Sequence, residues 1–116
     1  MSVSNRWQAI LFAPGKVVHD DFMIDENHPF DIQPYNFKED LLQVEFPNNL
    51  ILDVGWYPSF NPHGSFQLRV VEDYDWEHPV FYAKTERLGN LYSLLGMAVE
   101  FCRTAVLDHA ARLQPA

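Results

Sequence analysis

The stretch that decides the fold is residues 50–79, LILDVGWYPSFNPHGSFQLRVVEDYDWEHP. It contains two runs, residues 50–57 and 66–72, in which apolar residues recur at every second position, the period of a β-strand. Leu50, Leu52, Val54 and Trp56 share one face of the first run. The loop between the runs is too short for a parallel crossover, which needs about a dozen residues or more. The two runs are therefore predicted to form an antiparallel pair.

Shorter runs extend this pair on both sides. Residues 80–84 predict a third strand, so that residues 50–84 form a three-stranded meander. Residues 41–46 and 17–18 indicate short N-terminal strands, whereas the apolar run 7–13 fits a strand or a short buried helix equally well. Gly55, in the middle of a strand, indicates a bulge or the close approach of another backbone.

The period changes to three and four residues from about Leu88 onward, and it continues through Val106. This spacing predicts an amphipathic helix of five or more turns that buries one stripe on the sheet. Gly96 in this helix suggests close packing against the sheet. The predicted fold is α+β: an antiparallel sheet, made of the meander 50–84 and the N-terminal strands, packs in two layers against a long C-terminal helix.

Residues 25–40, DENHPFDIQPYNFKED, predict an irregular segment. The prolines Pro29 and Pro34 oppose both a helix interior and a central strand. The four apolar residues of this segment are too many for a free linker, so they either pack on the core or form a partner surface; they are Phe30, Ile32, Tyr35 and Phe37.

Composition narrows the class of protein. The 116 residues fit a single domain, 1–116, and 47% hydrophobic residues are enough for a core. The net charge of −8 argues against direct nucleic-acid binding, which needs clustered Lys and Arg, and favours a basic partner. One cysteine permits no intrachain disulfide, and no apolar run approaches the length of a membrane span, so we expect a cytoplasmic protein that does not bind membranes.

Three groups of residues could carry chemistry. The cluster His19, Asp20 and Asp21 contains metal-ligand types, but it lies among chain breakers and lacks a known metal spacing. Asp53 could act as a general acid or base, or simply point outward from the sheet. Cys102 falls on the apolar stripe of the helix, which is typical of an inert thiol. We therefore predict no catalytic residue, no metal and no cofactor.

Residues 72–78, EDYDWEH, are the strongest candidate for binding. Four acids and two aromatics lie in a predicted connection between strands, where loops often carry binding residues. Trp and Tyr are common interface anchors, and carboxylates steer basic partners. Alternatively, Trp76 covers the sheet edge and the acids are solvated. The predicted partner-binding residues are Asp53, Trp56, Tyr57, Glu72, Asp73, Asp75, Trp76 and Glu77.

Residues 50–106 resemble small acidic immunity proteins of bacterial polymorphic-toxin and contact-dependent growth-inhibition systems. The sequence D-V-G-W-Y-P from Asp53 to Pro58 and D-W-E from Asp75 to Glu77 carry this resemblance. It implies a cytoplasmic protein without enzymatic activity that neutralises the C-terminal domain of one cognate toxin, often a basic nuclease. It transfers no individual functional residue, because the binding surfaces of immunity proteins vary.

The leading hypothesis is thus an immunity protein that blocks the active site or substrate surface of a basic toxin domain. Two alternatives stay open. One is a small hydrolase that uses Asp53 or the His19–Asp21 cluster. The other is an adaptor or secretion-chaperone-like homodimer, and a homo-oligomer is compatible with either binding function.

Overall fold

The computed structural model describes residues 10–113 and contains five strands, two short 3-10 helices and one long α-helix. The strands are β1 (Lys16–Asp20), β2 (Leu42–Phe46), β3 (Leu50–Tyr57), β4 (Ser65–Glu72) and β5 (Phe81–Thr85). The 3-10 helices are η2 (Phe30–Ile32) and η3 (Pro34–Asn36), and the α-helix is α1 (Leu88–Leu113). The start of the apolar run 7–13 lies outside the described residues.

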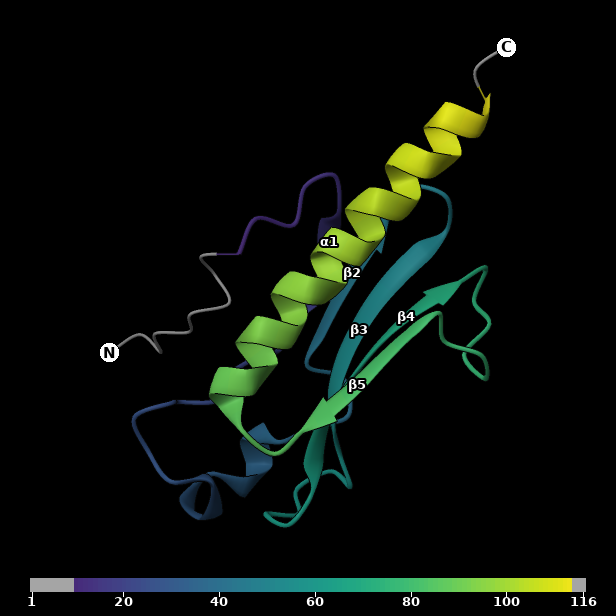
Figure 1. The fold of residues 1–116 in the computed structure, drawn as a ribbon. Coiled ribbons are helices and arrows are strands. Elements are labelled where there is room, and N and C mark those ends of the chain that lie inside the picture. Colours follow the sequence, from purple (N-terminus) through teal and green to yellow (C-terminus); the bar gives the residue numbers. More distant parts are fainter. Residues whose placement is uncertain (1–9, 114–116) are drawn as a thin grey trace.

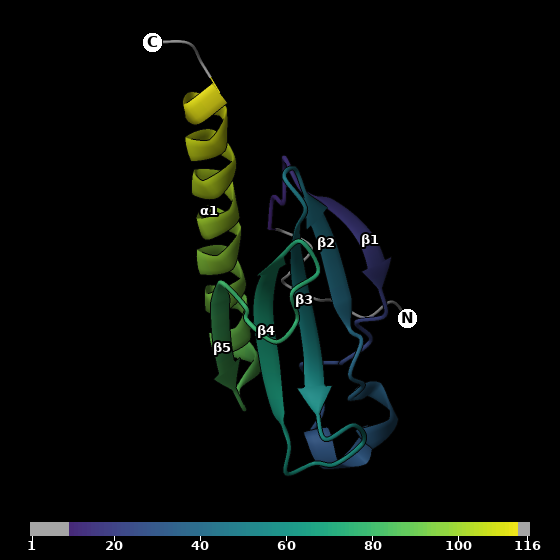
Figure 2. The same ribbon diagram turned by 90° about the vertical axis from the view of Figure 1, so that its right-hand side faces the viewer.

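The five strands form one antiparallel sheet in the order β1-β2-β3-β4-β5, and α1 lies across one of its faces (Figures 1 and 2). This arrangement confirms the predicted α+β class, the meander and the two layers. Each strand lies beside its neighbour in the sequence. The three connections between β2 and β5 are too short for a parallel crossover, and the longer β1–β2 connection, residues 21–41, also joins two antiparallel neighbours. No helix of residues 10–113 is both long enough and apolar enough to cross a bilayer.

The core lies between α1 and the sheet face that the alternating residues of β3 define. Leu52, Val54 and Trp56 are almost fully buried there, together with the matching residues of β2 and β4. The buried residues of α1 recur at three- and four-residue steps; they are Leu88, Leu91, Leu95, Ala98, Val99 and Cys102. Burial raises the pKa of the Cys102 thiol to about 12, which agrees with an inert core residue.

The two glycines that the sequence singles out behave differently. A Cβ at Gly55 would lie 1.9 Å from the Glu39 carbonyl oxygen, so the predicted close approach of another backbone is confirmed. A Cβ at Gly96 would meet nothing within 4 Å, so the expectation that Gly96 permits tight packing is wrong. Gly96 lies in α1 without a steric need for glycine.

Residues 38–40 cause the crowding at Gly55. They form an irregular extension of β2 along β3: the Trp56 backbone N–H donates to the Lys38 carbonyl at 2.7 Å, and the Leu41 N–H donates to the Val54 carbonyl at 2.9 Å. The residues between these two bonds bulge toward the sheet face turned away from α1, which we call the far face. The backbone of Glu39 thereby lies against Gly55.

The four apolar residues of the irregular segment 25–40 lie in two different environments. Phe30 and Phe37 pack on the core, with their ring centroids 4.5 Å apart. Ile32 and Tyr35 are exposed. The buried Gln33 side chain organises the loop, because its amide nitrogen donates to the Asp25 and His28 carbonyls and its amide oxygen accepts from the Asp25 N–H.

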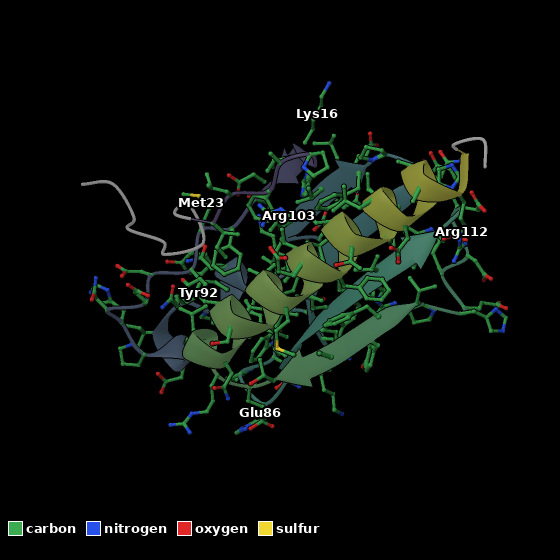
Figure 3. The ribbon with its side chains drawn as sticks, turned by 45° about the horizontal axis from the view of Figure 1, so that its top comes forward. Lys16, Met23, Glu86, Tyr92, Arg103 and Arg112 are labelled. Atoms are coloured by element: carbon green, nitrogen blue, oxygen red, sulfur yellow. The ribbon has the colours of Figure 1, made fainter. Side chains whose placement is uncertain are left out.

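Arg103 ties α1 to the N-terminal segment. Its guanidinium donates to the carbonyls of Leu11 and Ala13 and pairs with Glu100 one turn earlier on the helix (Figure 3). These bonds hold residues 11–13 beside the helix, on the flank that faces away from β5.

Candidate functional site

The predicted binding segment, residues 72–78, consists of the last residue of β4 and most of the connection to β5, and is named here the acidic loop. All seven residues are exposed. Tyr74 keeps 65% of its surface accessible and Trp76 keeps 38%, so both rings can reach a partner although part of Trp76 is covered. The loop projects beyond the end of the sheet (Figure 1).

Hydrogen bonds give the acidic loop a defined shape. The Asp75 N–H donates to the Glu72 carbonyl at 3.1 Å, and the His78 N–H donates to the Asp75 carbonyl at 3.2 Å. Asp73 and Tyr74 both adopt positive φ angles, of 55° and 62°. This left-handed pair reverses the chain directly after β4 and turns the following side chains outward.

The turn between β2 and β3 supports the acidic loop from the side. The Asp73 N–H donates to the Asn49 carbonyl, and the Asn49 side-chain amide donates to the Asp73 carboxylate, both at 3.1 Å. Asn48 and Asn49 have positive φ angles as well, a conformation that Asn tolerates better than most residues. Two turns that are distant in the sequence are thus joined at one end of the sheet.

A cavity of about 310 Å³ separates this end of the sheet from the C-terminal half of α1. Its lining combines apolar and charged side chains; it includes Glu72, Phe101, Asp108, His109 and Arg112. Glu72 therefore belongs both to the acidic loop and to this cavity. Figure 3 shows Arg112 at the end of the helix that overhangs this region.

Trp56 is not part of any partner surface in this structure, and its prediction as a binding residue is corrected. Only 1% of its surface is exposed. The indole N–H donates to the Asn61 carbonyl at 2.8 Å, and the ring packs on Phe37 and Phe66. The sequence carried this signal, because Trp56 shares its strand face with Leu52 and Val54.

Asp53 and Tyr57 lie on the far face of the sheet, away from the acidic loop. The register pairs Asp53 with Arg69, whereas Leu50, three residues earlier, pairs with Glu72 at the base of the loop. Three residues of a strand span about 10 Å. The structure therefore places the predicted binding residues in two groups, one in the loop and one in the middle of the far face.

Asp53 is buried, with 7% of the residue exposed, and burial raises the pKa of its carboxyl group above the ordinary value of 3.8. The Gln43 amide, which donates to Asp53 Oδ1 at 3.2 Å, and the positive charge of Arg69 oppose this rise. Arg69 itself is bound elsewhere, because its Nη2 donates to Gln67 at 2.9 Å. Ionisation of Asp53 therefore lowers the stability of the folded state.

The raised pKa of Asp53 predicts a pH dependence of stability. An acid whose pKa is higher in the folded state lowers the free energy of unfolding as pH rises from the unfolded pKa, near 3.8, through the folded value. The variant Asp53→Asn should lack this loss and gain stability relative to wild type between acidic and neutral pH. Chemical denaturation of both proteins across this range measures the difference, and a constant difference would contradict the prediction.

The sequence did not identify the three residues that complete the group around Asp53. They are Gln43, Arg69 and Tyr82. The register aligns Gln43, Asp53, Arg69 and Tyr82 in one row across four strands. The Arg69 guanidinium lies over the Tyr57 ring, at 5.6 Å from its centroid, and over the Tyr82 ring at 6.0 Å. Arg69 Nε is buried without a hydrogen-bond partner among the described residues.

The His19–Asp21 cluster does not converge on one point. His19 Nε2 lies 2.9 Å from the Asp40 carbonyl, the Asp20 carboxylate accepts from the Phe22 N–H, and Asp21 pairs with Lys38 at 2.6 Å. Within residues 10–113, no three His, Cys, Asp or Glu side chains are grouped so that they could hold a metal ion.

Comparisons with known proteins add no relative to this description. No family model matches the sequence, and neither the curated proteins nor the solved structures contain a significant match.

Proposed function

We propose that this protein is an acidic inhibitor that binds a basic toxin domain and blocks its active site or its substrate surface, as immunity proteins do. The observation that carries the proposal is the acidic loop. It presents four carboxylates and two aromatic rings at the end of a sheet, and hydrogen bonds to the β2–β3 turn hold it in shape.

The chemistry of the acidic loop suits a basic protein surface. Carboxylates accelerate the approach of a positively charged partner, and exposed Tyr74 and Trp76 offer the aromatic contacts that commonly anchor interfaces. The loop contains no Lys or Arg that would neutralise its carboxylates. Its one histidine, His78, has Nδ1 at 3.1 Å from Asp75 Oδ1. A preformed loop also loses less conformational freedom on binding than a flexible one.

The test is a charge reversal in the acidic loop. The binding partner to use is a toxin domain found encoded beside the gene of this protein. We expect Asp73→Lys, Asp75→Lys and Glu77→Lys, combined in one variant, to weaken binding to that domain at least tenfold, or by about 1.4 kcal/mol. Calorimetry of the purified pair measures the affinity, and growth of cells that express both proteins measures the protection. Wild-type affinity should also fall with added salt, because salt screens exposed charges.

A matched control separates local contacts from total charge. Asp31→Lys, Glu45→Lys and Glu86→Lys change the net charge by the same amount at three exposed acids outside the acidic loop. This control should keep most of the affinity. Equal losses in the two variants would reject the acidic loop as the binding site, and a wild-type chain that neither binds nor protects would reject the proposed function.

The hydrolase alternative has one observation in its favour, the raised pKa of Asp53. The second acid-base candidate, His19, has its Nε2 directed at the Asp40 carbonyl instead of Asp53. The far face, with Arg69 between two tyrosines, is as well suited to protein contacts, since Tyr and Arg are enriched in binding hot spots. We therefore propose a second contact region around Tyr57, Arg69 and Tyr82, with the buried Asp53 beneath it.

A further inference from the structure

Strand β5 is the last strand in the sheet order, so one edge of its backbone has no strand partner among residues 10–113. An unpaired edge is a template for another strand. The opposite edge, β1, is less suitable, because its register is broken between Val17 and His19 and such a bulge twists an edge away.

The flank of α1 above β5 adds an apolar surface to this edge. The Phe101 ring lies 5.6 Å from the Phe81 ring, and Leu94 borders a cavity together with Lys84 and Thr85. Met97 lies between Leu94 and Phe101 on the helix surface and is 58% exposed. We name residues 80–85 together with Leu94, Met97 and Phe101 the β5 strip.

The charge of the β5 strip indicates what can cover it. None of its residues is acidic, and Lys84 is its one base, whereas the chain as a whole has a net charge of −8. A basic partner would gain no electrostatic attraction from the β5 strip, because the strip contains no acidic residue. A second copy of an acidic chain meets the least repulsion on a surface without acids.

We propose that β5 pairs antiparallel with β5 of a second copy about a two-fold axis at Ala83, which joins the two sheets into one. In this register Tyr82 lies opposite Lys84 and Phe81 lies opposite Thr85, so that no like charges face each other. Continuing the same register places Glu86 of one copy opposite Val80 of the other and Arg87 opposite Pro79, so that no like charges meet at either end of the pair.

The same symmetry places both helices on one face of the joined sheet. Each α1 packs against β5 and β4 of its own copy, and neighbouring strands are about 4.8 Å apart. The flanks with Met97 and Phe101 therefore face each other above the two-fold axis and bury apolar surface that the strands alone leave exposed. The inference does not depend on the identity of any toxin.

The test is the mass of the purified full chain in solution, measured by light scattering and sedimentation. We expect a dimer for wild type and a monomer for the double variant Val80→Asp and Met97→Glu, which places acids at two exposed positions of the β5 strip. Leu107→Glu, at a more exposed position on another side of α1, should remain a dimer. Circular dichroism confirms that the variants are folded.

Cysteine cross-linking tests the register. Ala83→Cys lies opposite itself across the proposed axis and should form a disulfide between copies, whereas Thr85→Cys, two positions away, should not. Cys102 is buried and does not compete. A monomeric wild type, a dimer that survives the acidic double variant, or a dimer whose Ala83→Cys variant fails to cross-link would overturn the proposal.

Discussion

Replacing Gly55 with alanine should destabilise the fold by about 3 kcal/mol, at the upper end of the range for overpacked sites. The new methyl group would lie 1.9 Å from the Glu39 carbonyl oxygen and 2.7 Å from its carbon. These are backbone atoms, so no side-chain rotation relieves the clash. The extension at residues 38–40 must move away from β3, which strains the two backbone hydrogen bonds that attach it there.

Thermal and chemical denaturation of Gly55→Ala measure this effect, and we expect the midpoint to fall by roughly 10–20 °C. Gly96→Ala is the matched control, because a methyl group there meets nothing within 4 Å. Alanine favours a helix interior over glycine by about 1 kcal/mol, so the control should raise stability. If both variants lose stability alike, the close approach at Gly55 is not the cause.

Truncating Trp56 to alanine should cost about 3–5 kcal/mol, a large part of the stability of a domain of this size. The indole fills the space between β3, β4 and the segment 25–40. Its ring centroid lies 4.6 Å from Phe37, 4.8 Å from Phe66 and 5.8 Å from Phe30. Its N–H also fixes the β3–β4 loop through the Asn61 carbonyl.

Two further variants test what Trp56 contributes to stability. One isolates its hydrogen bond, and the other removes an exposed tryptophan as a control. Trp56→Phe keeps most of the packing and loses the hydrogen bond to Asn61, which is worth about 1 kcal/mol. Trp76→Ala, in the exposed acidic loop, should change the free energy of unfolding by much less and instead weaken binding to the proposed toxin partner. A comparable loss of stability in Trp56→Ala and Trp76→Ala would contradict the placement of one ring in the core and the other at the surface.

The fold was largely predictable, because the period of the apolar residues follows from which face of each element is buried. Alternation along residues 50–57 and 66–72 identified β3 and β4, and the change of period near Leu88 located α1. The 3-10 helices around Pro34 were not predictable, since their short turns depend on the buried Gln33 side chain. The prediction that Gly96 permits close packing was wrong, because the space around a helical glycine depends on tertiary packing.

The candidate site was predictable only in part. The acidic loop follows directly from a charged segment between two strands. The prediction for Trp56 relied on the general frequency of tryptophan at interfaces, whereas its alternation with Leu52 and Val54 was the better guide. The group around Asp53 depends on the register of four strands, which places Gln43, Arg69 and Tyr82 beside it from distant parts of the sequence.

The order of the elements along the chain has a consequence for biosynthesis. All five strands precede α1, which supplies the other half of the core. During translation the sheet residues therefore leave the ribosome before the helix that covers them, and the apolar face of β3 and β4 has no cover until residues 88–102 emerge. Nascent chains that end before α1 expose strands and apolar surface together, the combination that favours aggregation and chaperone binding.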